Sequence, residues 1–191
     1  MNNLNLGYAM CGSFCTLKKS VAQLKLLKEH GHNITPIMSD IVYNSDTRFY
    51  KCADLKTQVE EICKNTIINS VVGAEPIGPK KLFDVLIVCP CTGNTLSKIC
   101  NGITDTSVTM AVKAHLRNKK PVILAIATND ALGACAKNIG ILLNTKNIYF
   151  VPFEQDDPED KSTSLISDFT LLQDTLNLAL FGEQIQPIIK K

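Results

Sequence analysis

Residues 84–98, "DVLIVCPCTGNTLSK", pass from a continuous apolar run through a polar turn into the start of a helical pattern. A run that is apolar at every position, as in residues 85–88, is typical of a strand buried on both faces of a sheet. The "TGNT" that follows holds residue types that commonly begin a helix. The segment therefore predicts a strand, a turn and a helix, the unit from which parallel α/β sheets are built.

The same alternation extends along most of the chain. Strands are expected at residues 4–12, 33–39, 84–90, 121–127 and 147–153. Helices are expected from residue 17 to a stop at Gly31, and at 54–63, 94–103, 107–118, 131–143 and 165–181. Residues 71–80 and 154–164 are interpreted as loops, and 40–50 shows no clear period. This order predicts an α/β fold, a mostly parallel sheet covered by helices on both faces.

Length and composition limit the class of protein. The 191 residues suit one domain, expected to span 1–191, and 45% hydrophobic with 20% charged residues describes a folded soluble protein. The 20 basic and 18 acidic residues are scattered, so no nucleic-acid footprint is indicated. No apolar run approaches the ~18 residues of a membrane span, and the N-terminus lacks a signal-peptide pattern. We expect a cytoplasmic protein whose eight cysteines stay reduced.

The residues just after each strand are the candidates for ligand binding, because parallel sheets bind ligands beyond their carboxyl ends. Gly12 and Ser13 follow the first strand at a helix N-terminus, where free N–H groups favour a phosphate, although a glycine there can also be a plain turn. The chain has no GxGxxG motif, yet Asp40 lies where a dinucleotide site places its ribose-binding acid. A mononucleotide such as FMN, with Ser39 on its phosphate, fits at least as well.

Two further strands end in polar turns. Thr92 and Asn94 follow the strand at 84–90 and can act as N-caps or ligand contacts. The strand at 121–127 is followed by Thr128, Asn129 and Asp130. Asn129 and Asp130 can likewise act as helix caps or as ligand contacts. The clustering of such residues at strand ends favours a ligand.

The two cysteines of "CPC" invite a metal or thiol interpretation. A structural zinc site needs about four ligands in paired spacing, and neither a second cysteine pair nor a histidine pattern is present, so no metal is expected. Cys89 belongs to the buried strand, where cysteine acts as a small apolar residue. Cys91 beside a helix N-terminus leaves a reactive thiol as a secondary hypothesis.

These segments carry a resemblance. Residues 88–105, "VCPCTGNTLSKICNGITD", resemble the Pro-Ala-Ser-Ala-Asn-Thr segment of the flavoprotein family that includes phosphopantothenoylcysteine decarboxylase and lantibiotic cysteine decarboxylases. Residues 11–16, "CGSFCT", look like its first phosphate-facing loop. Segments over nearly the whole chain resemble one branch of that family, the B subunits of dipicolinate synthases: residues 12–16, 45–49, 69–80, 92–98, 113–133 and 145–158.

The resemblance implies a Rossmann-like, flavodoxin-type three-layer sandwich that binds FMN between subunits of a trimer-based assembly. Gly12, Ser13 and Ser39 would then take the phosphate. The flavin ring would face Pro90, Thr92, Asn94 and Thr95, and the expected cofactor set also includes Phe14, Thr128 and Asn129.

The branch further implies a reaction and a partner. A dihydrodipicolinate is oxidised to pyridine-2,6-dicarboxylate during sporulation, in the mother-cell cytoplasm. A partner A subunit, similar to a nicotinamide-dependent dehydrogenase, would carry NAD(P).

The chain departs from the family at one position, because Pro76 stands where the decarboxylases carry their active-site His. Decarboxylation of a cysteine-type substrate is therefore disfavoured, and a non-catalytic FMN-binding or assembly subunit is a further alternative. Glu75 is a candidate acid or base, or a surface carboxylate. Arg48 is the candidate for pairing with a substrate carboxylate, since its guanidinium can bind one with two hydrogen bonds, or it is a solvated loop residue. Asn94 completes the candidate catalytic set.

Overall fold

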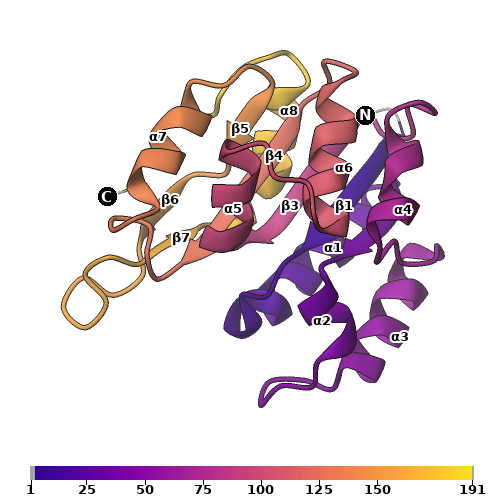
Figure 1. Ribbon diagram of the computed structural model, residues 1–191, viewed down its shortest axis with the longest axis horizontal. Coiled ribbons are helices and arrows are strands. Elements are labelled where there is room, and N and C mark those ends of the chain that lie inside the picture. The colour runs from indigo at the N-terminus through magenta and orange to yellow at the C-terminus, as the bar shows by residue number, and fades with distance from the viewer. Residues whose placement is uncertain (1–2, 191) are drawn as a thin grey trace.

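A computed structural model describes residues 3–190; residues 1, 2 and 191 of the expected 1–191 domain lie outside it. Seven strands form a sheet in the order β2-β1-β3-β4-β7-β6, with β5 also beside β4 (Figure 1). The β1–β2, β1–β3, β3–β4 and β4–β5 pairs are parallel, whereas the short β6–β7 hairpin pairs antiparallel with β4. The strands are β1 (Asn5–Met10), β2 (Asn33–Met38), β3 (Val85–Cys91), β4 (Val122–Thr128), β5 (Ile148–Phe150), β6 (Phe153–Gln155) and β7 (Leu165–Ser167).

Helices cover both faces of this sheet. The longer helices α1 (Leu17–Glu29), α3 (Cys52–Cys63) and α8 (Leu172–Ala179) pack on one face, and α5 (Gly93–Cys100), α6 (Ser107–Leu116) and α7 (Ala136–Leu143) pack on the other. The short helical elements are η1 (Phe14–Thr16), α2 (Asp40–Asn44), α4 (Val71–Ala74), η2 (Glu75–Ile77) and η3 (Phe169–Leu171). The predicted three-layer α/β fold with a mostly parallel sheet is confirmed.

The central strands form the core, and their side chains alternate between two apolar clusters. Tyr8 and Ile87 face the layer of α1 and α8, while Ala9 and Val88 face the layer of α5 and α6. All of β3 is buried, as its unbroken apolar run predicts. Because both faces are covered, only the ends of these strands reach the surface, and their carboxyl ends carry the turns that build the site.

Strand β4 has different neighbours along its length, which matters for the site. Its first half pairs with β5, and its last two residues, Ala127 and Thr128, pair with β7. The β6–β7 hairpin is thereby held at the carboxyl end of β4. The chain's last described segment protects the nearby edge, since the Gln184 side chain bonds both the N–H and the carbonyl of Phe150.

Several predictions near this hairpin are wrong because distant pairing overrides the local pattern. The helix predicted over 165–181 begins with strand β7, and its helical part starts only at η3, where the Asp168 carboxylate accepts the Thr170 N–H at 3.0 Å. The strand predicted over 147–153 ends at Phe150, and Pro152 separates it from β6. The loop predicted from residue 154 therefore starts inside β6.

Two other boundaries also differ. Residues 71–80 form α4 and η2 rather than an irregular loop, because Ser70 caps α4 and Pro76 stands in the first turn of η2, where its missing N–H costs nothing. The helix predicted from residue 131 starts at Ala136, since Asp130 holds the preceding turn through the Ala134 N–H at 3.1 Å. Helix α2 lies in the segment where no period was visible.

None of the helices found between residues 3 and 190 is both long enough and apolar enough to span a membrane.

Gly78 provides a test of the packing between η2 and α6. A Cβ added there would lie 2.9 Å from the backbone oxygen of Ala114, which cannot move aside as a flexible side chain can. We expect Gly78→Ala to lower the free energy of unfolding by about 1–3 kcal/mol, measured by urea denaturation. Gly140→Ala is the control, because that helical glycine has no atom within 4 Å of the added Cβ; it should be neutral or stabilise by up to about 1 kcal/mol. Equal effects of the two substitutions would contradict this account.

His115 predicts how stability depends on pH. Burial of this α6 side chain lowers the pKa of its imidazole from 6.5 to about 4, while Nε2 lies 3.1 Å from the Pro121 carbonyl oxygen. Between these pH values the unfolded chain binds the proton and the folded chain does not, so stability should fall on acidification, by up to roughly 1.4 kcal/mol per pH unit.

Denaturation of wild type and His115→Gln between about pH 7 and 4 tests this, with His30→Gln as the exposed control. The expected result is a shallower decline only in His115→Gln. Parallel curves for all three proteins would exclude the assignment.

Candidate functional site

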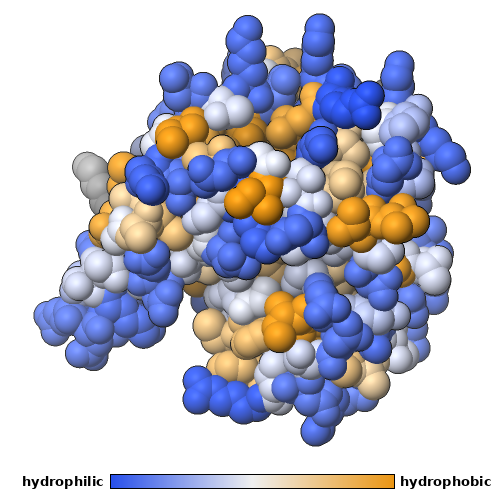
Figure 2. Space-filling view, viewed as in Figure 1, coloured by the Kyte–Doolittle hydropathy of each residue, from blue (hydrophilic) through white to orange (hydrophobic). Residues whose placement is uncertain are grey.

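A cleft of about 550 Å³ lies at the carboxyl ends of β1, β3 and β4. Figure 2 shows this side of the molecule hollowed between the projecting β6–β7 loop and the body. The sequence-predicted residues that line the cleft are Gly12, Ser13, Phe14, Arg48, Thr92, Asn94, Thr128 and Asn129. The fold thus brings together residues from four separate parts of the sequence.

The turn after β1 exposes backbone donors. The Ser13 carbonyl accepts the N–H and the hydroxyl of Thr16, which fixes η1, and η1 runs directly into α1. The first N–H groups of such a helix have no partner within it and carry partial positive charge. Gly12 lets the turn pack closely against its neighbours, because an added Cβ would lie 3.0 Å from Ile41 and 3.3 Å from the Phe14 ring.

Ser39 stands beside this turn without lining the cleft. Its N–H donates to the Met10 carbonyl at 3.1 Å, and it begins α2. The residue is only 9% exposed, and its Oγ has no hydrogen-bond partner among residues 3–190. A buried hydroxyl without a partner costs about 1–3 kcal/mol, so this oxygen is suited to bonding an anion at the adjacent turn.

The turn after β3 is held from below. Pro90 is joined to Cys89 by a cis peptide bond, and its carbonyl accepts the Cys11 N–H at 3.2 Å. Thr92 caps α5 by accepting the Thr95 N–H at 3.3 Å, and the buried Thr95 hydroxyl contacts the Cys11 sulfur. Pro90 and Thr95 are buried and do not line the cleft, whereas Thr92, Gly93 and Asn94 do.

The turn after β4 contacts the turn after β3. An added Cβ at Gly93 would lie 2.6 Å from the Thr128 hydroxyl and 2.9 Å from the Cys135 sulfur, so only glycine permits this approach. The Asn129 carbonyl accepts the Thr163 hydroxyl at 2.7 Å, which ties the turn to the β6–β7 loop. Asn129 does not cap α7, whose N-cap is Cys135.

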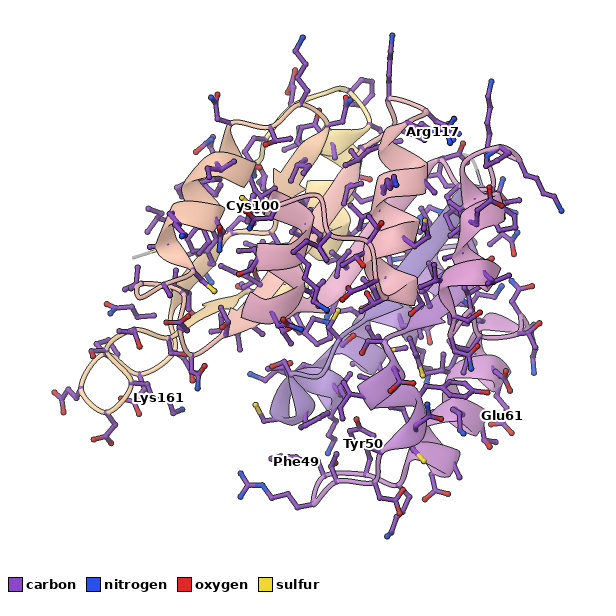
Figure 3. All side chains as sticks on the ribbon, viewed as in Figure 1. Phe49, Tyr50, Glu61, Cys100, Arg117 and Lys161 are labelled. Carbon is purple, nitrogen blue, oxygen red and sulfur yellow. The ribbon has the colours of Figure 1, made fainter. Side chains whose placement is uncertain are left out.

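The segment at 45–51 supplies one wall of the cleft. The Thr47 hydroxyl accepts the N–H groups of Phe49 and Tyr50, so the loop is bonded to itself. Its tip presents the Arg48 guanidinium 4.7 Å from the centre of the Phe49 ring, and Phe49 is 49% exposed. Tyr50 packs edge-on against Phe14. Figure 3 shows Phe49 and Tyr50 on one side of the hollow and Lys161 on the other.

Some lining residues were not predicted: Cys15, Thr16, Phe49, Gly93, Ala127, Asp156, Lys161, Ser164, Leu165 and Ile166. Half of them belong to the β6–β7 hairpin, a segment whose sequence pattern predicts a loop followed by a helix. The sequence signal for this hairpin was the polar run at residues 154–164, which lies between the short apolar runs at 148–153 and 165–166.

Glu75 is not brought to this cleft. It is exposed on η2, in the layer that packs against α6, and does not line the cavity.

The buried thiols beneath the cleft have little thiolate character. Burial raises the pKa of Cys11 to about 11 and that of Cys89 to about 12, and it raises the pKa of Cys91 well above its ordinary value. Cys91 is also fully buried, so the structure favours a packing role for its thiol over a reactive one. Within residues 3–190 no three His, Cys, Asp or Glu side chains are grouped to hold a metal ion.

Alkylation tests this distribution of thiols. Treating the folded chain with iodoacetamide near neutral pH should label the exposed Cys15 first, and should leave Cys89 and Cys91 unlabelled until denaturant is added. Peptide mass spectrometry over time measures each rate, and the denatured chain is the control for complete labelling. Labelling of Cys91 as fast as that of Cys15 would contradict the assignment.

Comparisons with known proteins identify the family of this chain. The family model described as Flavoprotein matches residues 1–176. The dipicolinate synthase B subunit of Bacillus subtilis (strain 168) is 41% identical over 184 residues, covering 96% of this chain and 92% of that protein. The crystal structure of the dipicolinate synthase B subunit from Bacillus halodurans C superposes with a TM-score of 0.92 at 41% identity, covering 100% of this chain and 99% of that one.

A more distant structure shares the fold. The FMN binding protein AtHal3 superposes with a TM-score of 0.68 at 17% identity, covering 96% of this chain and 100% of that one. The family model covers most of the chain, and a relative with 41% identity covers 96% of it, so both comparisons lead to the same family. The chain belongs to the Flavoprotein family.

Proposed function

We propose that this chain is the FMN-binding B subunit of a dipicolinate synthase, a cytoplasmic oxidoreductase of spore-forming cells. With an A subunit that carries NAD(P), it would oxidise dihydrodipicolinate to pyridine-2,6-dicarboxylate. The observation that carries the proposal is the 41% identity to a protein of that name over 96% of the chain. The cleft supports it through the chemistry of its lining.

The residues present fit FMN. The N–H groups after Gly12, the Ser13 hydroxyl and the unpartnered Ser39 hydroxyl are suited to a phosphate. Thr92 and Asn94, with Thr128 and Asn129, would face the flavin ring, and Phe14 would pack beside it. Pro90 and Thr95 would hold this surface from beneath. When bound, FMN supplies an acceptor for the electrons of a dihydropyridine.

The substrate would lie against the wall formed by residues 45–51. Arg48 would bind one carboxylate, and the exposed Phe49 ring offers a flat apolar surface to a flat ring. Asn94 at the start of α5 would donate a hydrogen bond to the reacting rings. A catalytic role for Glu75 would require a neighbouring copy in a trimer-based assembly, because Glu75 does not line the cleft of its own chain.

A second candidate is a non-catalytic FMN-binding or assembly subunit. Among residues 3–190, the charged side chains that line the cleft are Arg48, Asp156 and Lys161. No histidine of this range lines the cleft, so none is placed there to act as a base. Pro76, at the position of the decarboxylase His, favours the same view and argues against a third candidate, an FMN-dependent decarboxylase. The two leading candidates share a cofactor and differ in whether the cleft residues matter to turnover.

Reconstitution separates these candidates. The freshly purified chain should show a flavin absorption band, and adding it to the A subunit should raise the rate of dihydrodipicolinate oxidation. Arg48→Ala should raise KM roughly 10- to 100-fold, since a charged hydrogen-bonded pair is lost, and Asn94→Ala should lower kcat. Arg117→Ala is the matched control, because Figure 3 shows Arg117 at the far end of the molecule from Phe49.

An unchanged rate on adding the chain to the A subunit would exclude the proposal. Full activity of both cleft variants would favour the non-catalytic subunit, and release of carbon dioxide by the chain alone would favour the decarboxylase.

A further inference from the structure

We propose that Lys161 is a second carboxylate-binding residue, which acts across the cleft from Arg48 and selects dicarboxylates over monocarboxylates. The inference rests on the function proposed above and extends it to residues of the β6–β7 hairpin. Three observations carry it: the two walls of the cleft, the charges on them and the present partner of Lys161.

The two cations stand on opposite walls. Arg48 lies at the tip of the 45–51 loop and Lys161 lies in the β6–β7 loop, and both line the same cavity. Figure 3 shows Lys161 on the projecting loop and Phe49, the neighbour of Arg48, across the hollow. These are the basic side chains that line the cleft within the described part of the chain. A ligand with an anionic group at each end is the species that both can bind at once.

Internal hydrogen bonds fix the shape of each loop, so little reordering of the backbone that carries each cation is needed when a ligand binds. In the first loop, Asp46 accepts both the Cys52 N–H at 3.0 Å and the Lys51 ammonium at 2.9 Å. In the second, the Lys161 N–H donates to the Asp157 carbonyl at 2.7 Å, and the Gln155 amide donates to the Ser162 carbonyl at 2.9 Å. Such preorganisation lowers the entropy cost of holding a ligand between the loops.

The base of the second loop is bonded to the site itself. The Thr163 hydroxyl donates to the Asn129 carbonyl, and the Leu132 N–H donates to the Thr163 carbonyl at 3.0 Å. Lys161 is therefore two residues from a direct connection to the turn after β4. These bonds connect the loop directly to the candidate cofactor surface.

The present partner of Lys161 is a carboxylate. Its Nζ lies 2.8 Å from the Asp156 carboxylate, with side chains 54% and 38% exposed, so solvent screens the pair and a ligand can replace it. Asp156 also lines the cleft, and it raises the pKa of Lys161, which stays charged. Asp156 thus occupies the position where a ligand carboxylate would bind Lys161, and it competes with that carboxylate.

The surface between the cations suits a flat ring. Phe14 and, on one wall, Phe49 line the cavity with aromatic rings, and the β7 residues Leu165 and Ile166 add apolar surface. Arg48 can bind a carboxylate with two parallel hydrogen bonds, whereas Lys161 acts as a compact charge. An aromatic or dihydroaromatic ring with two carboxylates fits this arrangement better than a ring with one.

Calorimetric titration of the full chain, loaded with FMN, tests the assignment with pyridine-2,6-dicarboxylate and pyridine-2-carboxylate as ligands. Lys161→Gln should weaken binding of the dicarboxylate about 10-fold and leave the monocarboxylate within about 2-fold. Asp156→Asn should strengthen binding of the dicarboxylate by about 2- to 10-fold. Lys137→Gln, which removes an exposed lysine on α7 outside the cleft, is the matched control and should bind as wild type does.

The outcomes separate this inference from the proposed function. If wild type binds the dicarboxylate and Lys161→Gln binds it equally well, the role of Lys161 is excluded while the proposed function stands. If wild type binds neither ligand, and its addition to the A subunit does not change the oxidation rate, the proposed function fails and this inference with it. Weaker binding by Asp156→Asn would contradict competition by Asp156.

Discussion

Parallel pairing of β1, β3 and β4 is the constraint on which the rest of the structure depends. Because these strands run in one direction, their carboxyl ends meet at one edge, and the turns that follow them come together there. After each parallel strand the chain must cross back to the opposite end of the sheet, usually through a helix. The helices therefore cover both faces of the sheet, and the strands can be wholly apolar. The location of the cleft is thus a consequence of topology.

A buried polar network fixes the middle strand of the three. The Ser20 hydroxyl donates to the Cys89 carbonyl at 2.6 Å, and the Tyr8 hydroxyl donates to the Ser20 carbonyl at 2.9 Å. Helix α1 is thereby bonded to β3 near its carboxyl end, while the Cys11 N–H, just after β1, donates to the Pro90 carbonyl. Polar bonds inside an apolar core are costly to break, so this network holds the two strand ends in register beneath the cleft.

Sequence reasoning succeeded where periodicity and burial agree, as in β1 to β4 and in α1. It failed at residues 153–155 and 165–167, because three-residue strands are stabilised by partners that lie far along the chain and leave no period of their own. The strand-end residues such as Gly12 and Asn94 were predictable from topology. Lys161 was not, since its loop was identified by acidic composition alone, and its approach to the cleft depends on the β4–β7 pairing.

The two kinds of lining residue have different structural origins, and this suggests a division of labour. The turns at Gly12, Thr92 and Thr128 are fixed by the central strands, so any chain with this sheet presents them in the same place. The loops carrying Arg48 and Lys161 are additions bonded mainly to themselves, with a few ties to those turns. On the roles proposed for these residues, a change of substrate is expected to come mainly from changes in these two loops, while the surface proposed for the cofactor stays as it is.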